Sequence, residues 1–195
     1  MSSGDPETRK RILEKTWRLM EKRKGQGVKI SDIAHAAGVS RQAVYLHFGS
    51  RADLLVATVR YVDEVKNLDE RLEGLRTSVN ALQTLESYVD FWGNYIPEIH
   101  GLAKALLAVR ETDKDAAAAW DDRMQVLHEG WRSVIECLVR ENILSPEWDP
   151  DQAADAAWAI TSVSVWESLT TERGWSKDEY INRMKAILKK MFIKE

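Results

Sequence analysis

The segment from Ile30 to Leu55, ISDIAHAAGVSRQAVYLHFGSRADLL, constrains what this chain can fold into more than any other stretch. Its first eight residues carry apolar side chains at helical spacing, so a two-turn helix with one apolar face is predicted over 30–37. The apolar residues are Ile30, Ile33, Ala34 and Ala37. Gly38 follows, where a helix ends in a left-handed residue, a conformation that glycine adopts without a Cβ penalty. The chain is therefore predicted to turn at this glycine.

A second short helix is predicted from Arg41 to about Phe48. Ser40 precedes it, and its hydroxyl can accept a hydrogen bond from the backbone N–H of residue 42 or 43. Val44 and Phe48 lie one turn apart and are predicted to pack on the first helix. The residues that then face outward are Arg41, Gln42, Tyr45 and His47.

Two interpretations fit this pair of helices. A small residue at Ala34, a glycine at Gly38 and an apolar residue at Val44 are what two short helices crossing at a steep angle require, but an ordinary helical hairpin satisfies the same pattern. The outward side of the second helix favours a nucleic-acid function, because arginine and glutamine can form paired hydrogen bonds with base edges in a major groove. The segment is therefore predicted to be a helix-turn-helix unit that reads DNA.

From Val28 to Leu55 the sequence resembles the tetracycline-repressor (TetR) family of transcriptional regulators. The resemblance is strongest over 38–55, GVSRQAVYLHFGSRADLL, where a tyrosine–x–x–phenylalanine pattern ends at Phe48 and is followed by Gly49–Ser50 and a basic residue. Lys29 departs from the family, which often has a capping threonine or serine at this position.

The resemblance implies a homodimeric transcriptional regulator, usually a repressor, that binds a palindromic operator in double-stranded DNA and responds to a small-molecule effector. It also implies roles for individual residues. Gln42 and Arg41 are the candidates for reading bases. The positions that usually hold phosphates in the family correspond here to Ser40, Tyr45, His47 and Arg51.

Length and charge agree with a two-part organisation. The 195 residues can bury a substantial core, and an all-α fold is predicted because proline, glycine and alternating apolar and polar runs are scarce. We expect a three-helix, helix-turn-helix DNA-binding domain over 1–50 and a larger helical ligand-binding and dimerisation body over 51–195. Residues 1–60 hold 12 lysines or arginines against 6 acidic residues, whereas residues 61–195 hold 16 against 25. A basic head is attracted to phosphates, and an acidic body should face away from them.

About nine helices are expected from the periodicity and the breaks between periodic segments. The first is predicted over 7–24, and the fourth is predicted to begin at Arg51 and to continue to about Leu75. The resemblance implies that this fourth helix transmits ligand occupancy to the head. The further helices of the body are predicted over 78–96, 100–112, 116–142, 150–174 and 177–192.

A ligand site is predicted in the body. Tyr88, Trp92 and Tyr95 fall at i, i+4 and i+7, so one helix face presents three aromatic groups, each with a polar atom. Pockets for organic ligands are mostly apolar with a few polar groups, but aromatic residues at helical spacing also form ordinary core, and both interpretations stay open. The further candidates for the lining are His100, Arg110, His128 and Trp131.

A dimer interface is predicted on the last two helical segments, where dimers of the family meet. Two recognition helices must reach successive major grooves about 34–36 Å apart, so a dimer is required. The candidates are Trp158, Thr161, Val165, Leu169, Tyr180, Met184, Ile187 and Leu188. Internal core is the other interpretation of the same stripes.

Other functions find little support in the sequence. The four histidines show no metal-binding spacing, no Gly-x-Ser-x-Gly motif is present, and no cofactor or metal is expected. With a single cysteine, no signal-peptide pattern and no transmembrane stretch, the protein is expected to be cytoplasmic, with no membrane partner. Two alternatives stay open, namely an activator or effector-independent DNA-binding protein of the same fold, and a helical enzyme or carrier with a vestigial head.

Overall fold

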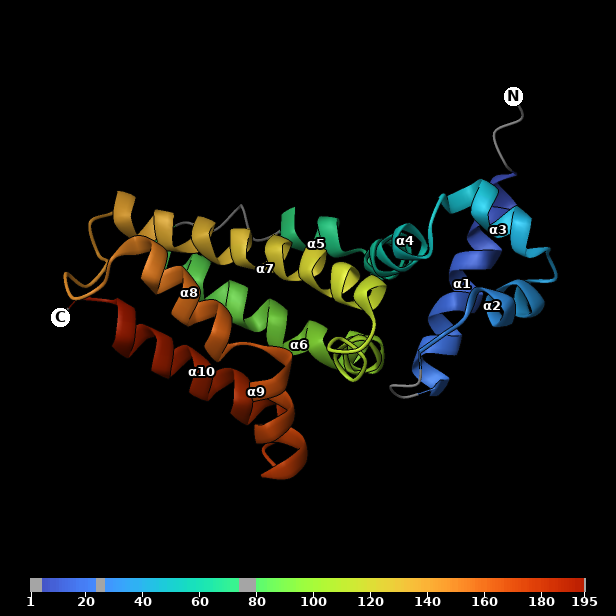
Figure 1. The fold of residues 1–195 in the computed structure, drawn as a ribbon. Coiled ribbons are helices and arrows are strands. Elements are labelled where there is room, and N and C mark those ends of the chain that lie inside the picture. The colour runs from blue at the N-terminus through green and yellow to red at the C-terminus, as the bar shows by residue number, and fades with distance from the viewer. Residues whose placement is uncertain (1–4, 24–26, 74–79, 195) are drawn as a thin grey trace. The chain divides into compact units, whose positions relative to one another are not determined.

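The computed structural model describes residues 5–23, 27–73 and 80–194. Within these ranges the regular elements are helices, joined by turns and by one isolated antiparallel bridge between Leu144 and Ile193, which confirms the all-α fold. Figure 1 labels the α-helices. In chain order the elements are α1 (Pro6–Arg23), α2 (Ile30–Ala37), α3 (Arg41–Phe48), α4 (Arg51–Val65), α5 (Leu68–Glu73), α6 (Ala81–Leu107), α7 (Lys114–Arg140), α8 (Pro150–Ile160), α9 (Val163–Glu167), the π-helical turn η2 (Ser168–Glu172) and α10 (Lys177–Phe192).

The chain divides into two compact units. Unit 1 combines 1–68 with 99–124, and unit 2 combines 69–98 with 125–195. The compact units do not divide at residue 50, because α4 and the 99–124 segment share one core with the first three helices. As a division by function, DNA binding over 1–50 and ligand binding over 51–195 stays a prediction.

The core of unit 1 is formed by the inner faces of α1 to α4 together with the end of α6 and the start of α7. Ile12 and Leu13 of α1 and Leu54 and Leu55 of α4 are at most 2% exposed. Burying one such side chain contributes roughly 1.5–3 kcal/mol, so the loss of any one of these four would destabilise the unit. The same core fixes α2 and α3, whose buried residues belong to it.

The fourth helix is shorter than predicted. α4 ends at Val65, and α5 begins only at Leu68. Between them Asn67 has a positive φ of 53°, a left-handed conformation that a helix cannot continue through but that asparagine tolerates better than most residues. A single helix from Arg51 to Leu75 is therefore wrong. Lys24, Leu75 and Ser78, which bound other predicted helices, lie outside the described residues.

Two predicted helices are one in the structure, because α6 continues through Pro97. Proline has no N–H and so removes one hydrogen bond from a helix interior. Ile96, just before the proline, and Leu102, five residues after it, are 2% and 3% exposed. Burial of the apolar face on both sides of the proline offsets the missing bond, and the predicted break there is wrong.

The segment predicted as one helix over 150–174 is three elements. α8 ends at Ile160, and Ser162 caps α9 by accepting a hydrogen bond from the N–H of Val165 at 3.4 Å. The π-helical turn η2 follows directly, and Gly174 has a φ of 76°. Serine competes for backbone groups at helix ends, which is why a new helix begins where the pattern predicted none.

The helices of unit 2 approach one another closely at two glycines. A Cβ on Gly93 of α6 would overlap the side chain of Ile181 of α10, and one on Gly130 of α7 would overlap the hydroxyl of Tyr88 of α6. Figure 1 shows α6, α7, α8 and α10 of this unit. Within the described residues, no helix has the length and apolar character needed to span a membrane.

Candidate nucleic-acid interface

The turn between α2 and α3 has the predicted form. Gly38 adopts φ 66° and ψ 36°, and the next amide, that of Val39, donates a hydrogen bond of 3.0 Å to the carbonyl of Ala34. A residue with a Cβ is strained in this left-handed conformation, so glycine is favoured here by the backbone itself. The turn closes α2 and sends the chain into α3.

α3 is capped and anchored as the sequence predicts. The hydroxyl of Ser40 accepts a hydrogen bond of 3.0 Å from the amide of Ala43, which supplies the first turn with a partner. Val44 and Phe48 are 1% and 7% exposed and join the core of unit 1. The apolar side of α3 is therefore fixed, and its opposite side is left to solvent.

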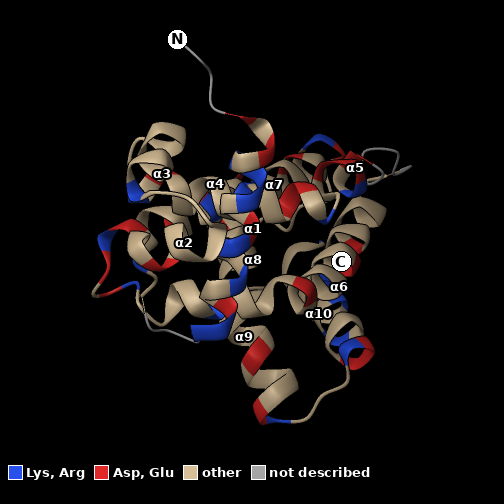
Figure 2. Cartoon of the chain, turned by 90° about the vertical axis from the view of Figure 1, so that its right-hand side faces the viewer, with Lys and Arg blue, Asp and Glu red and all other residues tan. Residues whose placement is uncertain are grey.

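The solvent side of α3 is rich in hydrogen-bonding groups and carries no acid. Arg41 and Gln42 are exposed, and Tyr45 is 42% exposed. Figure 2 shows the charged residues of this region, where Arg41 is the only lysine or arginine of α3. Leu46 lies on the same side with 81% of its surface exposed, and the sequence analysis did not single it out. Leu46 lies two residues from Val44 and two from Phe48, so helical spacing places it on the side opposite these buried residues, and this spacing was the signal that would have found it.

Two arginines of α1 contact the pair of helices α2 and α3. The Nε of Arg11 donates a hydrogen bond of 2.9 Å to the carbonyl of Ala37, at the end of α2. The guanidinium of Arg9 lies 5.0 Å from the centre of the Phe48 ring, at the end of α3, which is within the range of a cation–π contact. α1 therefore holds both helices from their carboxyl ends. His47, between Leu46 and Phe48, is half-buried.

Arg51, which was predicted to hold a phosphate, contacts other residues of unit 1, and its contact with DNA stays a prediction. Its Nε donates a hydrogen bond of 2.9 Å to the carbonyl of Val28, and its two Nη atoms each donate one of 2.7 Å to the carboxylate of Asp113. Nη1 also donates one of 3.0 Å to Asp115. With its side chain only 20% exposed, the guanidinium is engaged inside unit 1.

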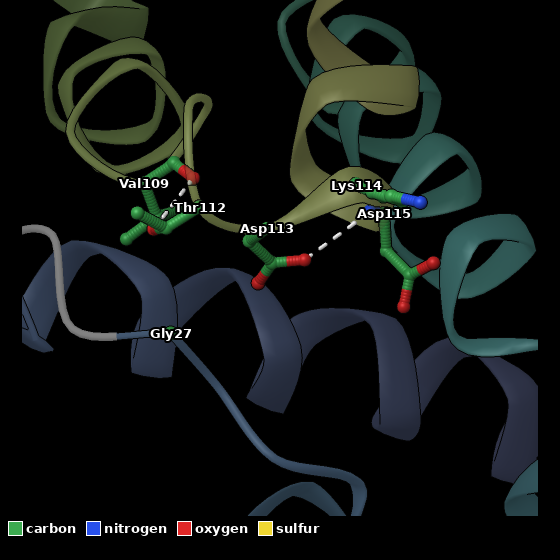
Figure 3. A pocket seen from close by; sticks show the side chains of 6 residues that line it. All are labelled: Gly27, Val109, Thr112, Asp113, Lys114 and Asp115. Carbon is green, nitrogen blue, oxygen red and sulfur yellow. Dashed lines mark hydrogen bonds between the residues drawn. The ribbon is translucent and has the colours of Figure 1, made fainter.

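These acidic partners stand at the beginning of α7. Figure 3 shows Asp113 and Asp115 on the wall of a pocket of about 340 Å³, with Gly27 opposite. The hydrogen bond from Arg51 holds the pKa of the Asp113 carboxyl below its ordinary value of 3.8, so this residue is ionised at neutral pH. Nothing in the local sequence around Arg51 indicates a partner 62 residues away.

The predicted ligand residues are divided between the two units. In unit 2, Tyr88, Trp92, Tyr95 and Trp131 are buried in one aromatic cluster, together with Phe91. The ring centres of Tyr88 and Trp131 lie 4.8 Å apart, and those of Phe91 and Tyr95 lie 5.3 Å apart. At these separations the rings are in contact, so the cluster forms core in this structure.

The other three candidates are one histidine and one arginine of unit 1 and one histidine of unit 2. His100 and Arg110 belong to unit 1, where exposed Arg110 pairs with Asp121 at 2.9 Å. His128 is in unit 2 and its Nε2 lies 2.7 Å from a carboxylate oxygen of Asp155. Whether any of the seven residues contacts a ligand stays a prediction.

Half of the predicted dimer residues are core residues of the single chain. The buried four, each at most 5% exposed, are Thr161, Tyr180, Met184 and Leu188. Thr161 also accepts a hydrogen bond of 2.9 Å from the Nε1 of Trp131. These four side chains therefore lie in the internal core of the single chain, which favours the other interpretation of the stripe, and the dimer interface stays a prediction. Ile187 is 39% exposed, and the half-buried remainder are Trp158, Val165 and Leu169.

Residues 12–58, from α1 into α4, match the family model described as bacterial regulatory proteins, tetR family. The HTH-type transcriptional repressor LfrR of Mycolicibacterium smegmatis is 31% identical over 134 residues, and this match covers 67% of the chain. The chain belongs to the TetR family. The match of this TetR-family chain to LfrR spans 64% of the relative, slightly less than two thirds of its length. The family is one of regulatory proteins and not of enzymes.

Two solved structures share the whole fold of this TetR-family chain. A protein from Saccharomonospora viridis in complex with choline aligns with a TM-score of 0.75 and 21% identity, over 98% of this chain and 100% of that one. NalD, the secondary repressor of the MexAB-OprM multidrug efflux pump in Pseudomonas aeruginosa, aligns with a TM-score of 0.68 and 20% identity, over 97% and 98%. At these identities the likeness is one of fold.

Proposed function

We propose that this chain is a transcriptional repressor that binds a palindromic operator as a homodimer in the cytoplasm and leaves it when a small-molecule effector binds. The observation that carries the proposal is the solvent side of α3, where Arg41, Gln42 and Tyr45 are exposed on a helix anchored by its other side. A helix presented in this way fits the major groove, and its first residues meet base edges there.

Within this proposal the residues of α3 and its cap Ser40 contact two different parts of the DNA, the bases and the phosphates. Gln42 and Arg41 read base edges, because their amide and guanidinium groups can form two hydrogen bonds with one base. Ser40, Tyr45 and His47 hold phosphates and set the register of the helix on the duplex. Ser40 can do so while capping α3, since its hydroxyl accepts one hydrogen bond and has a hydrogen left to donate.

Dimerisation is proposed through the solvent sides of α8 to α10, with exposed Ile187 and half-buried Trp158, Val165 and Leu169 as the contacting residues. Ile187 is one of the few large apolar side chains that the described part of the chain exposes, and an exposed apolar side chain gains most from being covered by a partner. Ile187→Glu should therefore convert a dimer into a monomer, which light scattering measures directly.

The effector is proposed to bind among the aromatic residues of unit 2. Since these rings are in contact, a ligand must separate some of them, and it thereby favours a different conformation of the body. The factor by which such a ligand lowers the affinity for DNA cannot exceed the ratio of its own affinities for the two conformations. The S. viridis structure in complex with choline supports the idea that this fold accepts small ligands.

The test of DNA binding uses the purified full chain and DNA flanking its own gene, with a shuffled duplex of the same composition as control. Preferential binding that weakens as salt rises is expected, because lysine and arginine displace counterions from DNA. Tyr45→Phe should weaken binding to specific and shuffled duplexes nearly equally. Tyr61→Phe, a change in α4, is the matched control and should leave both unchanged. Equal affinity of the wild type for both duplexes would contradict the proposal.

The effector is tested on the preformed protein–DNA complex. Compounds processed by the products of neighbouring genes are titrated in, and release is followed by fluorescence anisotropy of the labelled duplex. Release at a concentration that leaves the fold intact supports the proposal. A compound that binds the protein without changing its DNA affinity is not the effector.

A further inference from the structure

Leu46 is the most exposed large apolar side chain in the described part of the chain, with 81% of its surface in solvent. Its exposure has no role in the fold, because Val44 and Phe48 anchor α3 from the other side. An apolar side chain in water gains nothing until another apolar group covers it. The position is therefore free of structural constraint and is available for contact with a partner.

Leu46 shares its helix face with a predicted base-reading residue. It lies four residues after Gln42, and residues at this spacing stand one above the other on a helix, with Cβ atoms about 5–6 Å apart. Wherever the amide of Gln42 meets a base edge, Leu46 lies one helical turn further along the same groove. Tyr45, three residues after Gln42, stands beside them.

We propose that Leu46 selects thymine, by packing on the C5 methyl group of that base in the major groove, next to the base pair that Gln42 reads. The thymine methyl is the one apolar group on the major-groove edges of the four bases. Leucine has no donor or acceptor, so over any other edge it displaces water from polar atoms without replacing their hydrogen bonds. This inference rests on the proposed DNA-binding function and adds a base preference to it.

A protein partner is a poorer explanation of this leucine. Protein docking sites are contiguous apolar patches of several hundred Å². The exposed residues nearest Leu46 on α3 are Gln42, one turn before it, and Tyr45, directly beside it, so the apolar surface is small and is bordered by an amide and a hydroxyl group. α3 carries one arginine and no acidic residue, a charge that is complementary to the phosphates that line a groove.

The test separates the methyl group from everything else in the base. A duplex is first selected by the wild-type protein from a randomised library, and each thymine of one half-site is then replaced in turn by deoxyuridine, which lacks only the C5 methyl. Wild-type affinity should fall about fourfold at one thymine, the value expected for one buried methyl group, and should change little at the others. Leu46→Ala should bind the unmodified duplex more weakly and should not distinguish thymine from deoxyuridine at that position.

Two variants serve as controls. Leu46→Met keeps an apolar side chain of similar volume and should keep the preference for thymine, whereas Leu82→Ala removes an exposed leucine of α6 and should behave as wild type. Since Leu46 is so exposed, its replacement should not change the melting temperature.

Wild-type protein that tolerates deoxyuridine at every thymine, or a Leu46→Ala variant that keeps the full preference, overturns the proposal while DNA binding itself stands. Failure of the wild type to select any duplex overturns the DNA-binding function, and this inference with it.

Discussion

Arg51 and Asp113 form a bidentate ion pair, in which each Nη of the guanidinium donates a hydrogen bond of 2.7 Å to a different carboxylate oxygen. The pair joins the first residue of α4 to the residue just before α7, inside unit 1. Two further pairs join the same helices, between Arg60 and Asp122 at 2.7 Å and between Arg123 and Asp63 at 3.1 Å. Three ion pairs thus join α4, the helix that follows the helix-turn-helix unit, to the start of α7.

Arg51→Lys is expected to destabilise the protein by about 1–3 kcal/mol, because lysine cannot reproduce the paired geometry and leaves polar partners at a half-buried site. Arg60→Lys is the matched control. Its pair is exposed, so its replacement should cost less than about 1 kcal/mol. Denaturant unfolding followed by circular dichroism measures both. Equal effects of the two variants would show that the Arg51 contacts are no stronger than surface pairs.

The contribution of Asp113 should depend on pH. Its pKa in the folded chain lies below the ordinary value of 3.8, chiefly because of the hydrogen bond from Arg51. A carboxyl whose pKa is lowered on folding stabilises the folded chain at pH values above its ordinary pKa. This contribution is lost as the pH falls through the pKa that the carboxyl has in the folded chain. The difference in unfolding free energy between wild type and Asp113→Asn should therefore be constant from pH 7 to about pH 5 and should shrink below about pH 4. A difference that grows on acidification has the wrong sign for this pair.

Thr161→Val should cost about 1–3 kcal/mol, because it leaves the Nε1 of Trp131 buried without its acceptor. Thr58→Val is the matched control. The hydroxyl of Thr58 is equally buried but bonds only to the carbonyl of Leu54 on its own helix. Its loss strands no donor, so the cost should be smaller. Thermal unfolding of the two variants compares them, and a Thr58 variant as unstable as the Thr161 variant would argue against the tryptophan bond.

Tyr180→Phe should not destabilise the chain. The hydroxyl of Tyr180 is buried with no hydrogen-bond partner among the described protein atoms, and burial raises its pKa. Removing an unpaired buried polar group is neutral or stabilising, by up to about 1 kcal/mol. The melting temperature should stay or rise. A fall equivalent to more than about 1 kcal/mol would mean that the hydroxyl has a partner in solution.

The helix-turn-helix unit was predictable because its determinants are local. The bounds of α2 and α3 follow from Gly38, which must end one helix, and from Ser40, which caps the next, and both lie within two residues of the ends they define. The burial of Val44 and Phe48 follows from helical spacing alone.

The incorrect helix bounds arose where packing, or the conformation of a single residue, overrides the hydrophobic pattern. Packing on both sides of Pro97 keeps α6 intact, and a left-handed Asn67 ends α4, and neither can be read from periodicity. The contact of Arg51 with Asp113, 62 residues away, could not be predicted from the residues around either one. Tyr180, Met184 and other apolar residues of the last helices are buried in their own unit. The sequence could not show this, because an apolar stripe looks the same in an internal core and in a dimer interface.

The central claim, that the solvent side of α3 reads the bases, is tested most directly by parallel selection of duplexes from one randomised library with wild type and Gln42→Ala. The wild type should select two half-sites related by a two-fold axis, about 34–36 Å apart. Gln42→Ala should lose the preference at one or two base pairs of each half-site, at a cost of about 1–3 kcal/mol each, and keep the rest. Identical preferences and affinities for the two proteins would contradict the claim.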